Sequence, residues 1–190
     1  DTPQEVKLHC AYRGRINPPR QPFTIHDAPH LLAHHPSIWS AIYRRDFLMQ
    51  NNIWFKEIPG AGWADNPFLV ETLCQAKAIA YWPKPYYCYR EETPEKAAAL
   101  AKRDPLMPFN RWNDMVDILE RLNVTDPAVW TPQITRGFTY MGIMIEHTGI
   151  AGHPEIEQAI HRMFERMPQE LVFANLRVTP AAKKLYAEYM

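Results

Sequence analysis

The sequence predicts an α/β fold over its first half and a mostly helical second half, from two observations. Before residue 92, short runs of β-branched and aromatic residues are separated by prolines and glycines and flank helical segments. From Thr93 onward, apolar residues recur at three- and four-residue spacing between proline or glycine breaks. We therefore expect a partial mixed sheet with flanking helices over residues 1–92, followed by a helical C-terminal subdomain over residues 93–190.

The strands of the predicted sheet are short and rich in the residue types that strands favour. They are expected at residues 6–12, 53–57, 78–82 and 83–90, the last as a strand or an extended edge. Between the first two, residues 37–50 place Trp39, Tyr43 and Phe47 four apart, with charged residues on the other side. That spacing predicts an amphipathic helix.

A second helix is expected to begin after the glycine-containing loop at residues 59–62. Pro67 fits the first helical position, which makes Asn66 the expected N-cap. Asp65 then lies one residue too early to cap the helix.

The second half is expected to form helices between its breaks. The segments with helical periodicity are residues 95–103, 109–122, 127–149, 154–167 and 180–190.

Composition excludes several classes of protein. Of the 190 residues 46% are hydrophobic, enough for a buried core, and the equal numbers of Lys+Arg and Asp+Glu, 21 each, argue against nucleic acid as a partner. Three cysteines without a CxxC pair are typical of reduced thiols. No apolar run approaches the roughly 20 residues that cross a bilayer, so we expect no transmembrane segment and a cytoplasmic protein, free or peripheral at the inner face of the membrane.

Asp65 has two interpretations that the spacing leaves open. As an acid at the terminus of a helix it is favoured by the helix dipole and needs no further role. As a carboxylate beside a glycine loop and Trp63, it is also suited to act as a general base toward an alcohol, with the indole packing on a sugar ring.

Two further groups of residues are weaker candidates. His30 and His34 are four apart, as in some zinc sites, but no nearby cysteine pair or acid completes a tetrahedral set, so polar loop histidines are favoured and no metal site is expected in this chain. Arg44, Arg45 and Arg90 suit either a solvated surface or a clamp on a pyrophosphate.

The ordered series HPSIWSAIYRRDFLMQNNIWFKE and GWADNPFLVETLCQAKAIAYWPKPYYCYREE resembles the second half of the catalytic domain of family 2 glycosyltransferases, which have the GT-A fold. The resemblance covers about residues 5–92 and lies in the order and distances of the motifs. The matching residues are Trp39, Ile42, Tyr43, Arg44, Arg45, Phe47, Leu48, Asn52, Ile53, Phe55, Asp65, Phe68, Pro85, Tyr86, Tyr89 and Arg90.

This resemblance implies inverting transfer of a sugar from a nucleotide-diphosphate sugar to a hydroxyl of a carbohydrate or lipid-linked acceptor. Asp65 would be the base that removes the acceptor proton. The implied substrate-binding residues are Trp39, Gly62, Trp63, Asn66 and Arg90, with the loop before Asp65 bordering the acceptor and Arg90 facing the donor. The family usually has Glu before this aspartate, whereas this chain has Ala64.

The nucleotide-binding half of such an enzyme, with the Asp-x-Asp pair that holds Mg or Mn, has no counterpart in these residues. The chain starts at Asp1 and enters an apolar segment almost at once, so we expect an upstream part, a divalent metal only in a full-length protein, and an isolated chain that is inactive. The alternative is a non-enzymatic module that binds another protein, in part through Trp112, Trp130 and Tyr140. The helical half is also a candidate surface for homo-oligomers.

Overall fold

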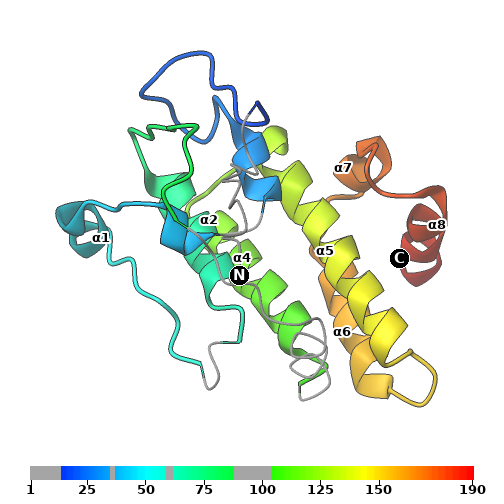
Figure 1. The fold of residues 1–190 in the computed structure, drawn as a ribbon. Helices are drawn as coiled ribbons and strands as arrows, with labels where there is room; N and C mark the ends of the chain where they lie inside the picture. The colour runs from blue at the N-terminus through cyan, green and yellow to red at the C-terminus, as the bar shows by residue number, and fades with distance from the viewer. Residues whose placement is uncertain (1–13, 35–36, 59–61, 88–103) are drawn as a thin grey trace, which may run out of the picture.

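The computed structural model describes residues 14–34, 37–58, 62–87 and 104–190, and within these ranges the protein is helical (Figure 1). Two short 3-10 helices, η1 and η2, precede the α-helices. In chain order the elements are η1 (Pro29–Ala33), η2 (Ile38–Ser40), α1 (Arg45–Gln50), α2 (Asp65–Gln75), α4 (Met107–Arg121), α5 (Pro127–His147), α6 (Pro154–Glu165), α7 (Gln169–Ala174) and α8 (Pro180–Tyr189).

The prediction of an α/β, GT-A-like sheet is wrong for the described residues. Residues 53–57 and 78–82 form no strand, and the β pairing seen there is one isolated antiparallel bridge, in which Phe23 and Ile79 exchange hydrogen bonds of 2.9 and 2.7 Å. A strand is stable only when a neighbour pairs with its backbone along its length. The composition of these segments suits a strand, but no ladder forms beyond this bridge. Residues 6–12 and 88–90 of the other two predicted strands lie outside the described ranges.

The single helix predicted over residues 37–50 is also wrong, because the segment divides into η2 and α1. Ser37 has a φ of +34°, and Ala41 is extended with φ −126° and ψ 152°. The aromatic residues contact different parts of the chain, since the ring of Trp39 lies 6.3 Å from that of Tyr87, whereas the ring of Tyr43 lies 5.3 Å from that of Phe68. One straight helix would have placed both rings on one face.

The helices expected at residues 109–122, 127–149, 154–167 and 180–190 are confirmed as α4, α5, α6 and α8. Proline stands at the start of α5, α6 and α8, where its missing N–H costs nothing. The carboxylate of Asp126 caps α5 by accepting a hydrogen bond of 2.9 Å from the amide of Ala128. Helix α7 was not predicted, and residues 95–103 lie outside the described ranges.

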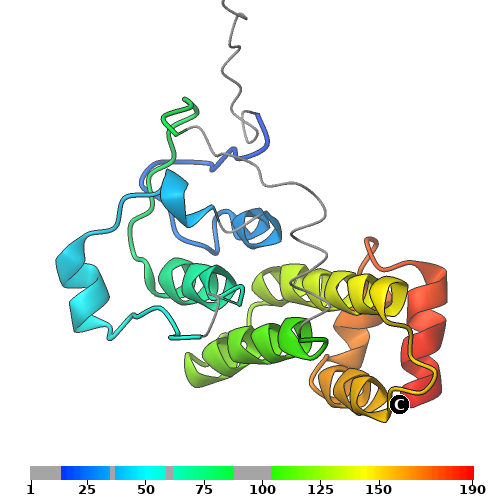
Figure 2. The same cartoon turned by 60° about the horizontal axis from the view of Figure 1, so that its bottom comes forward.

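Helices α4, α5 and α6 pack side by side, with α8 against α6 and α7 against α5 (Figure 2). Trp112 of α4 is fully buried, and its indole N–H donates to the carbonyl of Gln133 in α5 at 2.8 Å. Gly137 of α5 lies against this indole. The absence of a side chain there lets α4 and α5 approach closely.

Helix α2 connects the first half to this bundle. It packs against α4, and η1 packs against both α5 and α2. Val70 of α2 and Leu32 of η1 belong to the same buried cluster as Trp112. In contrast, α1 extends away from the bundle (Figures 1 and 2).

Candidate functional site

Asp65 is the first residue of α2 rather than a residue before it. The cap position is Ala64, with φ −62° and ψ −18°, so Pro67 is the third helical residue and Asn66 is not the N-cap. Proline is tolerated there because the N–H groups of the first turn have no partner within the helix. Asp65 is partly exposed, at the end of the helix where the dipole favours a negative charge.

Asn66 is buried, with 6% of its surface exposed, and its side chain joins α2 to α5. Its carbonyl oxygen, Oδ1, accepts hydrogen bonds from the guanidinium of Arg136 and, at 3.0 Å, from the hydroxyl of Tyr140. Its Nδ2 donates to Oδ1 of Asp65 at 3.2 Å and weakly to the carbonyl of Trp63 at 3.4 Å. We call Asp65, Asn66, Arg136 and Tyr140 the Asn66 cluster.

Arg136 also fixes the end of η1. Its second terminal nitrogen donates to the backbone carbonyls of Leu32, at 2.6 Å, and His34, at 2.9 Å. Because a guanidinium is planar and only donates, these contacts hold it in one orientation between η1 and α2.

Tyr140 is mostly buried, and its surroundings change its acidity. Burial raises the pKa of its hydroxyl, the charge and hydrogen bonding of Arg136 lower it, and the negative charge of Asp65 raises it. The carboxylate of Asp65 and the guanidinium of Arg136 therefore have opposite effects on the acidity of the same Tyr140 hydroxyl.

Gly62 and Trp63, which precede Asp65 in the described part of the chain, are closely packed. Gly62 is buried with φ +30°, and a methyl group added there would lie 2.9 Å from Cγ2 of Ile58. Trp63 is half-buried with φ +58°, and its ring lies 5.0 Å from that of Tyr140. Part of the indole surface therefore covers the Asn66 cluster.

The other predicted site residues lie elsewhere. Trp39 is placed beside Tyr87, and Arg44 and Arg45 are exposed at the start of α1. Arg90 lies outside the described residues. Gly62, Trp63 and Asn66 lie within three residues of Asp65 in the sequence, and Asn66 donates a hydrogen bond to its carboxylate.

The histidines do not form a metal centre within the described ranges. The rings of His30 and His34 are 6.3 Å apart and perpendicular, and burial, followed by the nearby positive groups, lowers the pKa of His34. Nδ1 of His26 instead lies 2.7 Å from the carboxylate of Asp126. No group of three potential ligands gathers anywhere in the described part of the chain.

Two grooves were not predicted. One, of about 350 Å³, lies between the segment after α1 and helices α2 and α4, where Phe55 stacks on Phe68 at 3.9 Å and Lys56 pairs with Asp114. Asp65 is not among its lining residues, although Phe68 follows it by one helical turn.

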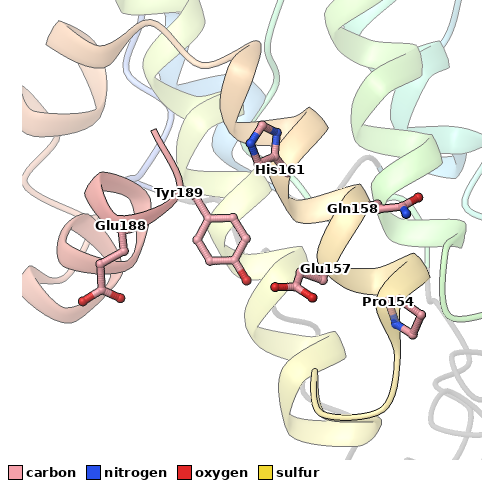
Figure 3. A pocket seen from close by; sticks show the side chains of 6 residues that line it. All are labelled: Pro154, Glu157, Gln158, His161, Glu188 and Tyr189. Atoms are coloured by element: carbon pink, nitrogen blue, oxygen red, sulfur yellow. The ribbon is translucent and has the colours of Figure 1, made fainter.

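The other groove, of about 450 Å³, lies between α6 and α8 (Figure 3). Glu157 of α6 and Glu188 of α8 border it, and the hydroxyl of Tyr189 points toward Glu157. Burial and then these two negative charges raise the pKa of Tyr189. The two carboxylates give this groove a negative charge, which suits a cation better than the diphosphate of a sugar donor.

Arg136 and Tyr140 were missed as partners of Asn66. The available signal was a polar stripe on an apolar helix, because Gln133, Arg136 and Tyr140 follow one another at i, i+3 and i+7 and so share one face.

Comparison of the chain with protein-family models, curated proteins and solved structures found no match. None of the helices within the described ranges has the length and apolar character needed to span a bilayer.

Proposed function

We propose that this chain carries the acceptor side of an inverting glycosyltransferase, with Asp65 as the base. The acceptor oxygen bonds to the anomeric carbon of a nucleotide-diphosphate sugar while the bond from that carbon to the diphosphate oxygen breaks. The electron pair leaves on the diphosphate, and the acceptor proton passes to the carboxylate of Asp65.

The observation that carries the proposal is the placement of Asp65. Its carboxylate is partly exposed and lies at the start of α2. It accepts a hydrogen bond from the buried amide of Asn66, which in turn accepts hydrogen bonds from Arg136 and Tyr140 of α5. A general base must be fixed and still reachable by its substrate. The resemblance of the residues around Asp65 to family 2 motifs supports the same role.

The proposal does not depend on a sheet within the described residues. It assigns the acceptor proton to this chain, and it assigns the donor nucleotide and its Mg or Mn ion to a separate nucleotide-binding part, because these 190 residues contain no Asp-x-Asp pair. We therefore propose that residues 1–190 alone bind nucleotide sugars poorly. Calorimetric titration with nucleotide sugars and MgCl₂ or MnCl₂ checks this, and tight binding would contradict it.

The test of the function uses the protein as its gene encodes it. A panel of uridine and guanosine diphosphate sugars is combined with saccharide and lipid-linked acceptors, and release of the nucleoside diphosphate is measured. We expect release that depends on the acceptor, with inversion at the anomeric carbon of the product by NMR. A product of retained configuration would exclude Asp65 as the base of a direct displacement.

A second function, that of a protein-binding module, is favoured by the exposed aromatic residues of the first half. Trp54, Trp82 and Tyr86 are 61%, 63% and 77% exposed. Exposed apolar side chains that form a contiguous patch often mark a protein interaction site.

Sedimentation velocity on the purified protein tests self-association through these side chains. A concentration-dependent dimer that the double variant Trp54→Ala, Trp82→Ala disperses would support the second function. A monomer at all concentrations would count against a second copy as the partner.

A further inference from the structure

The Asn66 side chain can take only one orientation in its cluster. An amide has one oxygen that accepts and one nitrogen that donates, and Arg136 can only donate. The oxygen must therefore face Arg136, and it also faces the hydroxyl of Tyr140. The amide nitrogen is then directed at the carboxylate of Asp65 and the carbonyl of Trp63.

The donors on α5 are themselves fixed. Arg136 is anchored by the carbonyls of Leu32 and His34, and the ring of Tyr140 is mostly buried and packs on that of Trp63. Arg136 and Tyr140 are four residues apart, so one face of α5 presents both to α2. A rotation of Asn66 would set its carbonyl against the carboxylate of Asp65, and it would take the shared acceptor away from the buried hydroxyl of Tyr140 and from one guanidinium nitrogen of Arg136.

We infer that Arg136 and Tyr140 are positioning residues, which act through the Asn66 amide to hold the carboxylate of Asp65 in its working orientation. This inference rests on the proposed role of Asp65 as a base. It gives the helical second half a function in the reaction, because α5 then sets the geometry of a group on α2.

A merely structural role, in which these side chains only join α2 to α5, makes a different prediction for one substitution. Asn66→Asp keeps an oxygen for Arg136 and Tyr140 to donate to, so the connection between the helices remains. It replaces the amide nitrogen with a second oxygen, which cannot donate to Asp65 when ionised. Positioning is lost while the connection is kept.

The experiment measures kcat and the donor KM of the full-length protein for Asn66→Asp and Tyr140→Phe. We expect kcat to fall on the order of tenfold to a hundredfold, part of the 10²–10⁴-fold that general acid–base catalysis contributes, with the donor KM unchanged. Tyr186→Phe is the matched control, because it also removes a buried hydroxyl, one that donates to the carbonyl of Met167 at 2.9 Å. Wild-type kcat in Asn66→Asp would overturn the inference.

A second measurement does not depend on catalysis or on folding of Asn66→Asp. The NMR titration of the Tyr140 hydroxyl is compared between the wild type and Asp65→Asn, and we expect the pKa of Tyr140 to fall when the neighbouring negative charge is removed. An unchanged titration would mean that Asp65 does not face the Asn66 cluster. If Asp65→Asn keeps full transferase activity, the proposed function fails; if it is inactive while Asn66→Asp is fully active, the positioning role alone fails.

Discussion

Gly137 and Gly142 lie in the same helix, α5, and substitution of each by alanine should change stability in opposite directions. A methyl group at Gly137 would lie 2.4 Å from Cε of Met167 and 2.7 Å from Nε1 of Trp112. The methionine end can move, but the buried indole is held by its hydrogen bond to Gln133. At Gly142 there is no atom within 4 Å of the added methyl.

The magnitude follows from these contacts. Overpacking a core costs about 1–3 kcal/mol, whereas replacing glycine by alanine within a helix gains about 0.8–1.0 kcal/mol. The two terms together predict that Gly137→Ala lowers the free energy of unfolding by up to about 2 kcal/mol, whereas Gly142→Ala raises it by up to about 1 kcal/mol. For a chain of this size each kcal/mol corresponds to roughly 2–4 °C in Tm.

The assay is urea unfolding of both variants, followed by circular dichroism and tryptophan fluorescence, with a thermal scan for comparison. Equal stability of the two variants would refute the packing of α5 against Trp112. A loss of stability in Gly142→Ala would show that the exposed face of α5 has been assigned incorrectly.

Two further predictions concern single side chains. Hydrogen bonds from His26 and the Ala128 amide lower the pKa of Asp126 below its usual 3.8, so its contribution to stability is present above that pH and is lost as the pH falls through the lowered pKa. Urea unfolding should therefore show Asp126→Ala less stable than the wild type by about 1 kcal/mol at pH 7, typical of a lost N-cap. The difference should shrink in strong acid. A difference that stays constant with pH would show that the negative charge of Asp126 does not contribute to stability. Burial, followed by the charge of Glu71, raises the pKa of Cys74 to about 12, so iodoacetamide should modify Cys74 slowly at pH 8 until denaturant is added, as mass spectrometry of its tryptic peptide would show. Rapid modification in the native protein would contradict the burial.

The helices of the second half could be predicted because each carries its own evidence. Apolar residues recur with the helical period, and Pro127, Pro154 and Pro180 mark three starts. The core formed by these helices then follows from their apolar faces.

The first half was predicted less well because its elements depend on contacts distant in sequence. Residues 53–57 have the composition of a strand, but a strand needs a partner that composition does not reveal. Asn66 was predicted as a cap from Pro67 alone, whereas its side chain is engaged by Arg136, 70 positions away. Gly62, Trp63, Asp65 and Asn66 are neighbours along the chain, so their proximity follows from the sequence, whereas the contact of Asn66 with α5 does not.

The most direct test of the account is sugar transfer by Asp65→Asn in the full-length protein. Asp46→Asn is the matched control, since Asp46 is an exposed aspartate that also lies in the first turn of a helix. We predict that Asp65→Asn loses transfer by at least about a hundredfold while binding the donor as tightly as the wild type, and that Asp46→Asn is unaffected. Transfer by Asp65→Asn at the wild-type rate would contradict the assignment of the acceptor proton to this carboxylate.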